Sequence, residues 1–235
     1  MVQQSIASLV MENPQIVQVL EKYSIDFCCR GKGNLADACK EKSIDLSKVL
    51  REIEAVQKPD TNKTMPFVEM TQEQLVNHII VKHHYYVKQA MPAILDRLGK
   101  IVKKHGEQFA NILEVKELFE TIKSEMDPHM QKEELILFPR IIQKEKELES
   151  NQHPSFPENY ISGPISMMAM EHEIAGDIMF EIRSLTNKYK IPPGACTTFR
   201  VCMAELKEFE DDLHKHVHLE NNILFPRALQ MGLSA

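Results

Sequence analysis

A twelve-residue motif that occurs twice is the feature that most constrains the fold. Residues 129–140 read HMQKEELILFPR, and residues 216–227 read HVHLENNILFPR. Each copy has a histidine, a glutamate four residues later and the same Leu-Phe-Pro-Arg ending. A further histidine precedes each copy, His84 by 45 residues and His172 by 44. We infer that one ligand-bearing helical hairpin is used twice, which predicts a four-helix bundle of two related halves.

The spacing within each copy indicates a metal site. A histidine and a glutamate at positions i and i+4 lie on one face of a helix, so that both side chains can reach one point. The pairs are His129 with Glu133 and His216 with Glu220. Imidazole suits iron, zinc and copper, whereas carboxylates suit harder cations and can bridge two of them, so the combined set favours two adjacent irons. A solvent-exposed histidine-glutamate contact, worth about 0.2–0.5 kcal/mol, is the alternative, but the shared apolar ending predicts that these helix ends pack inward.

The remaining ligands must be chosen among ten histidines. His83 and His84 are adjacent and point about 100 degrees apart on a helix, so only one of them easily faces the site. The repeat spacing prefers His84. Near the second copy, only His216 has a glutamate four residues later. His105 lies near the expected start of the second long helix, where the residues alone leave a ligand and a cap equally open.

Composition favours an all-α chain and excludes some functions. The 235 residues include eight glycines and no tryptophan, and long stretches lack turn signals. A formal net charge of -6 argues against a nucleic-acid binder. The N-terminus lacks the basic region of a secretory signal, and no apolar run reaches the roughly 18–20 residues of a membrane helix. We therefore expect a cytoplasmic protein that binds no nucleic acid and no membrane.

The chain divides into two expected units. Residues 1–56 predict a small helical N-terminal domain, with helix starts at Asn13-Pro14, near Leu35 and at Ser43–Asp45. The polar, proline-containing stretch within residues 57–70 predicts a linker. Residues 71–235 predict the bundle, with long helices from Thr71, from about 107 to 143, from 164 to 189 and from 195 to 222. Pro128 lies inside the second of these and is expected to kink it or to free a carbonyl group.

A pair of adjacent cysteines is the candidate second functional site. The chain has five cysteines, an odd number that argues against a disulfide framework. Adjacent thiols such as Cys28 and Cys29 close a disulfide only with strain, and the nearby Arg30 and Lys32 favour thiolate. A thiolate pair can bind iron, carry sulfur or reduce a partner. Two structural cysteines in a tight turn remain the alternative.

Taken together, these motifs resemble the iron-sulfur cluster repair di-iron proteins, which join a small N-terminal domain to a hemerythrin-like bundle. The resemblance covers almost the whole chain, and two sequence features depart from it, Arg30 after the cysteine pair and Pro128 before a ligand histidine. It rests on these segments: DFCC at 26–29, HIIVKHH at 78–84, HMQKEE at 129–134, GPISMMAMEHEIAG at 163–176, ACTTF at 195–199 and HLENNILFPRAL at 218–229.

The resemblance implies a ligand set and a function. It implies two non-haem irons with an oxo or hydroxo bridge, and it makes His105 a ligand. The implied ligands are five histidines and two bridging glutamates: His84, His105, His129, His172, His216, Glu133 and Glu220. The implied function is repair of iron-sulfur clusters damaged by oxidative or nitrosative stress, through the supply of iron, with damaged iron-sulfur proteins as partners and a possible homodimer. The alternative is hemerythrin-like binding, sensing or reduction of nitric oxide or oxygen, and enzymatic activity stays open between these readings.

Overall fold

The described part of the protein is all-α. The structure is a computed structural model that describes residues 4–13, 16–23, 25, 27, 33–56, 67–150, 156–157 and 159–231. Within these ranges there is no strand, and the β contact that occurs is an isolated bridge between Ser5 and Asn34. None of the helices in these ranges is both long and apolar enough to cross a membrane. The predicted fold class, a helical bundle preceded by small helices, is confirmed.

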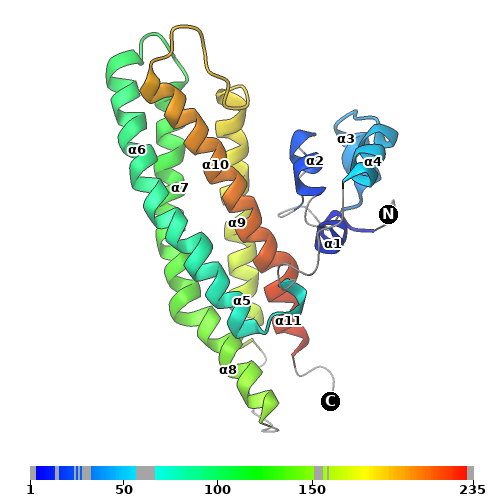
Figure 1. The fold of residues 1–235 in the computed structure, drawn as a ribbon. Coiled ribbons are helices and arrows are strands. Elements are labelled where there is room, and N and C mark those ends of the chain that lie inside the picture. Colours follow the sequence, from blue (N-terminus) through cyan, green and yellow to red (C-terminus); the bar gives the residue numbers. More distant parts are fainter. Residues whose placement is uncertain are drawn as a thin grey trace.

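Four long helical rods form the bundle (Figure 1). Three of them contain a short π-helical segment, labelled η, between two α-helices. The rods are α5 (Gln72–Ile79), η3 (Ile80–His84) and α6 (Tyr85–His105); α7 (Ile112–Lys132), η4 (Glu133–Leu137) and α8 (Phe138–Glu149); α9 (Ser162–Leu185); and α10 (Thr197–Leu219), η5 (Glu220–Leu224) and α11 (Phe225–Gln230).

Apolar residues at helical spacing hold the rods together. On α6, the side chains of Val87, Met91, Ile94 and Leu98 are all buried, which is the stripe that a core-facing helix requires. Helix α6 packs against both α7 and α10, and α7 packs against α9. The first rod begins at the predicted capping box, in which Thr71 accepts from the Gln74 amide and the Gln74 side chain accepts from the Thr71 amide.

The start of the second rod differs from the sequence expectation. It was expected from about residue 107, but α6 continues to His105 and α7 begins only at Ile112, so that His105 ends the first rod. Pro128 lies within α7 without ending the helix. The expected kink or free carbonyl group at Pro128 stays a prediction.

The N-terminal helices are short, and their buried residues share one hydrophobic cluster with the bundle. They are α1 (Ile6–Glu12), α2 (Val17–Lys22), α3 (Leu35–Glu41) and α4 (Leu46–Ala55), of which α1 was not predicted. Ser5 caps α1 by accepting from the Ser8 amide. Phe27 is buried, and its ring lies 5.7 Å from that of His214 and 5.9 Å from that of His218 on α10. The stretch 57–66, within the predicted linker, lies outside the described residues.

The aromatic core of the bundle yields a first prediction. Phe119 of α7 and Phe209 of α10 are fully buried and meet edge to face, with ring centroids 5.1 Å apart. We expect Phe119→Ala to lower the free energy of unfolding by about 3–5 kcal/mol, since it leaves a cavity that the rigid rods cannot close. Urea denaturation followed by circular dichroism measures this. Leu113→Ala on the same helix, at a half-exposed position, is the control and should change the value by less than about 0.5 kcal/mol.

Candidate metal centre

Three widened helical turns carry the residues of the predicted metal site. In η3, η4 and η5 the backbone bonds reach five residues back, from Tyr85 to Ile80, from Phe138 to Glu133 and from Phe225 to Glu220. The Leu-Phe-Pro-Arg ending explains two of the three. A proline crowds the carbonyl four residues before it, and a wider turn relieves that clash. Sequence reasoning missed these π-helical turns, although the repeated proline was the signal for them.

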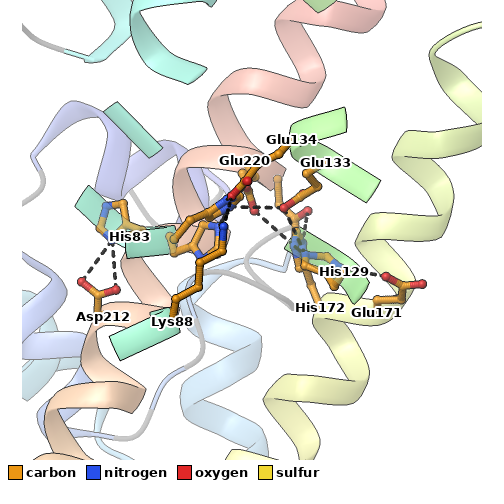
Figure 2. A network of polar contacts seen from close by, with 12 residues as sticks. His83, Lys88, His129, Glu133, Glu134, Glu171, His172, Asp212 and Glu220 are labelled. Atoms are coloured by element: carbon orange, nitrogen blue, oxygen red, sulfur yellow. Dashed lines mark hydrogen bonds and ion pairs between the residues drawn. The ribbon is translucent and has the colours of Figure 1, made fainter. Parts of the chain in front are cut away.

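The structure brings six of the predicted side chains together in two overlapping groups. One group is His84, Glu133, His216 and Glu220, and the other is His129, Glu133, His172 and Glu220. All six side chains are buried, and both glutamates belong to both groups. Figure 2 shows Glu133 and Glu220 close to His129 and His172. The structure therefore has two adjacent four-ligand positions that share two carboxylates.

Each glutamate lies between the two positions. Glu133 Oε2 lies 3.4 Å from His84 Nε2 and 3.4 Å from His129 Nε2. Glu220 divides its oxygens, with Oε1 3.0 Å from His216 Nε2 and Oε2 3.2 Å from His172 Nε2. Glu133 thus faces both groups with one oxygen and Glu220 with two, and either arrangement would allow a carboxylate to bridge two cations.

The histidines meet in pairs through their Nε2 atoms. His84 and His216 have Nε2 atoms 3.1 Å apart, and His129 and His172 have theirs 3.0 Å apart. Two nitrogens bound at right angles to one ion, each at about 2.1 Å, would be separated by about 3.0 Å. Without a cation, one member of each pair must donate a proton to the other. The spacing fits one metal ion for each pair.

Protons take the place of cations in the metal-free cluster. Burial opposes a charge on His84, but the Glu133 and Glu220 carboxylates beside its Nε2 outweigh this effect and raise the pKa of His84 to about 10. Burial likewise opposes a charge on His172, whose pKa Glu220 raises to about 9. Burial lowers the pKa of both His129 and His216 to about 4. Each pair therefore has one protonated and one neutral ring, and metal binding must release the proton.

The two shared glutamates have no lysine or arginine partner among the described residues. Glu133 and Glu220 are fully buried, and their ion-pair partners among the described residues are only histidines. Both oxygens of Glu133 and Oε2 of Glu220 have no hydrogen-bond partner. Burial raises the pKa of Glu133 to about 7, with the neighbouring Glu220 as the next cause. Such carboxylates are costly unless a cation neutralises them.

A third buried glutamate shows how the protein neutralises a carboxylate by itself. Glu210 of α10 accepts from Arg183 Nε at 2.9 Å on both oxygens and from Tyr189 Oη at 2.9 Å. It has the guanidinium and the hydroxyl group that Glu133 and Glu220 lack. This contrast within one bundle supports a metal site at the other two glutamates.

His105 and the cysteine pair lie elsewhere. His105 ends α6, 21 residues after His84 on the same rod, which at 1.5 Å per residue is about 30 Å away. Its ring contacts Phe109, and it is absent from both ligand groups. The structure thus gives no support to His105 as a ligand, since a straight rod cannot bring it back to His84. Cys28 and Cys29 lie outside the described residues.

Two adjacent groups of buried histidines that share two glutamates, inside a helical bundle, fit a metal-binding protein of the hemerythrin type, and the chain belongs to that family. The family model for the Hemerythrin HHE cation binding domain matches residues 75–228. A second family model, the Domain of Unknown function (DUF542), matches residues 2–57.

Similar curated proteins are named for iron-sulfur cluster repair. The Iron-sulfur cluster repair protein YtfE of Citrobacter koseri is 32% identical to this chain over 229 residues, which cover 96% of each. The protein of that name from Escherichia coli O81 is 32% identical over 226 residues, and that from Escherichia fergusonii is 31% identical, with 96% coverage of each chain in both cases.

Glu133 and Glu210 are both buried but are neutralised differently, and this difference predicts opposite effects of the same substitution. We expect Glu133→Gln to leave the stability of the metal-free protein unchanged or higher, because a buried glutamine needs no proton or cation to neutralise it. Its metal content should fall well below two ions per chain. Glu210→Gln should lower the free energy of unfolding by about 3 kcal/mol and leave metal content intact, since it leaves Arg183 without its counter-charge. Urea denaturation and elemental analysis measure both effects, and equal destabilisation by the two variants would contradict the contrast.

The position of His105 gives a direct test of the ligand set. We expect His105→Ala to bind as much metal as the unaltered protein, because its ring lies at the far end of α6. His129→Ala should bind less, because it removes one nitrogen from a four-ligand group. Elemental analysis after loading under anaerobic conditions compares the two. A loss of metal in His105→Ala, with the fold intact, would restore His105 to the ligand set.

Proposed function

We propose that this protein repairs damaged iron-sulfur clusters by supplying iron from a di-iron centre. The observation that carries the proposal is the buried pair of four-ligand positions that share Glu133 and Glu220. The proposed ligands are the four histidines and two glutamates of those groups, without His105. The curated relatives, which are named for iron-sulfur cluster repair and covered along almost their whole length, support the same function.

Iron is the metal that suits this set of donors. Four imidazole nitrogens and two carboxylates combine borderline and hard ligands. A set of this kind, which lacks thiolates, suits iron better than zinc or calcium. Two six-coordinate ions offer about twelve positions, and the six side chains supply about eight donor atoms. About four positions remain for an oxo or hydroxo bridge, for solvent or for small ligands. When bound, the irons supply redox-active metal and exchangeable cargo, and the side chains hold them in a buried site.

The open positions support a second candidate function. Nitric oxide or oxygen can bind where a redox metal has free coordination positions, so hemerythrin-like binding, sensing or reduction of these gases is the alternative. The two functions differ in what becomes of the iron. Repair by donation removes iron from the protein, whereas gas binding leaves it in place.

A repair assay with labelled iron tests the proposal. We expect protein loaded with radioactive iron to restore activity to an iron-sulfur enzyme damaged by nitric oxide, with the label appearing in that enzyme. Glu133→Gln should restore little, because it holds little metal, and His105→Ala serves as the matched histidine control that keeps full activity. Equal restoration by Glu133→Gln would refute iron donation. Reversible gas binding with no transfer of label would favour the alternative.

The cysteine pair is the proposed second element of the repair function. The double variant Cys28→Ser with Cys29→Ser keeps every proposed metal ligand. We expect it to hold iron and bind gas normally but to fail in repair, because the thiols would receive the iron or contact the damaged partner. The reducing cytoplasm is the compartment that we propose, since it keeps such thiols reduced. A homodimer is proposed by resemblance alone, and sedimentation analysis measures it directly.

A further inference from the structure

The four proposed ligand histidines differ in the hydrogen-bond partner of Nδ1, the ring nitrogen that faces away from the metal positions. His84 Nδ1 lies 2.7 Å from a carboxylate oxygen of Glu134, and His129 Nδ1 lies 2.8 Å from one of Glu171. His172 Nδ1 lies 3.0 Å from the amide oxygen of Asn221. His216 Nδ1 is shielded from solvent and has no hydrogen-bond partner. One ligand of the four thus lacks the acceptor that the others have.

The repeat shows what replaces that acceptor. His216 and His129 are counterparts in the two copies of the motif, and each is approached by the residue that precedes the ligand histidine of another helix. For His129 this residue is Glu171, which precedes His172. For His216 it is His83, which precedes His84 and stacks flat on the His216 ring, with centroids 5.6 Å apart and planes at 5°. The His83 ring therefore takes the place that the Glu171 carboxylate has in the other half, and it accepts no hydrogen bond from His216 Nδ1.

A second contact keeps His83 in this stacked position. His83 Nδ1 lies 3.0 and 3.1 Å from the two carboxylate oxygens of Asp212 on α10 (Figure 2). The ring is therefore held by Asp212 and does not turn a nitrogen toward His216. The His83 ring, held by Asp212, packs against the His216 ring, but neither residue accepts a hydrogen bond from His216 Nδ1.

The acceptors on the carboxylate side also differ. Lys88 Nζ lies 2.7 Å from Oε1 of Glu134, which is the same oxygen that His84 uses. Lys132 binds Oε1 of Glu171, whereas His129 uses Oε2. One oxygen of Glu134 thus accepts from both His84 and Lys88. In Glu171, by contrast, one oxygen accepts from His129 and the other from Lys132. Both differences weaken the position formed by His84 and His216.

We propose that the two metal positions hold their ions unequally, and that the position between His84 and His216 is the one that gives up its ion. A carboxylate on the distal nitrogen raises the basicity of a ligand histidine and fixes its ring, and its loss typically costs 10–100-fold in metal affinity. The position between His129 and His172 retains its ion. This inference rests on the proposed function, because it names the cargo position of the same centre. The ion leaves in the oxidation state in which it was bound, so no electron donor is required.

Release kinetics test the inequality. Reduced protein loaded with two ferrous ions is mixed anaerobically with an excess of a coloured ferrous chelator. We expect two phases of equal size, one ion per chain each, with rates that differ about tenfold or more. A single phase that releases both ions would overturn the proposal.

Two opposite variants assign the phases to positions. His83→Glu with Asp212→Asn places an acceptor beside His216 as Glu171 does beside His129, and should slow the fast phase about tenfold. Glu171→Leu removes the acceptor of His129 and should accelerate the slow phase by a similar factor. Glu173→Gln, an exposed position next to His172, is the charge-matched control and should change neither. Unchanged kinetics in both test variants would overturn the assignment.

An anomalous-scattering crystal structure after release of one ion per chain decides the assignment without any variant. We expect residual iron density between His129 and His172. Residual density between His84 and His216, or equal density at both positions, would overturn the assignment.

The outcome of the release experiments is separable from that of the repair assay. Unequal release without repair would leave this inference standing and remove the proposed function, whereas repair with equal release would do the reverse.

Discussion

The bundle depends on how two glutamates buried between its helices are neutralised. Glu133 and Glu220 are fully buried, and the described part of the protein gives neither of them a lysine or an arginine. Protons shared among the four neighbouring histidines can hold them only in the metal-free state. A pair of cations neutralises the same carboxylates and satisfies the same nitrogens, so binding and folding are linked. Glu210, neutralised by Arg183, shows that this fold can bury a carboxylate without a metal.

The backbone prepares the site by departing from α-helical geometry where the ligands lie. Widened turns occur at Ile80–His84, Glu133–Leu137 and Glu220–Leu224, which contain or border His84, Glu133 and Glu220. One extra residue in a turn changes the direction of the side chains that follow, which is why such turns often occur at functional sites. The remainder of each rod is regular and packs through buried apolar side chains. The site therefore combines locally irregular backbone with rigid support on both sides.

Much of the fold and most of the site follow from the sequence, and the failures have physical causes. The repeated histidine-glutamate spacing predicted two ligands per copy because a helix turns by a fixed angle per residue. His105 was proposed by resemblance alone, but a residue 21 positions along the same rod from His84 cannot reach the same point. The outer partners Glu134, Glu171 and Asn221 were missed, because contacts between helices depend on rod rotation, which spacing within one helix does not fix.

The centre is symmetric in its ligands and asymmetric in what surrounds them, and this combination suits donation of iron. Two equally held ions would tend to be kept together or lost together, and losing both would leave Glu133 and Glu220 with only the protons of the neighbouring histidines. Unequal positions avoid this, because both glutamates contact both positions, so one retained cation still faces both carboxylates. The His129 and His172 position, supported by Glu171 and Asn221, can then keep the bundle compensated while the other position is emptied and refilled. A gas carrier has no need of such inequality, because both of its ions stay.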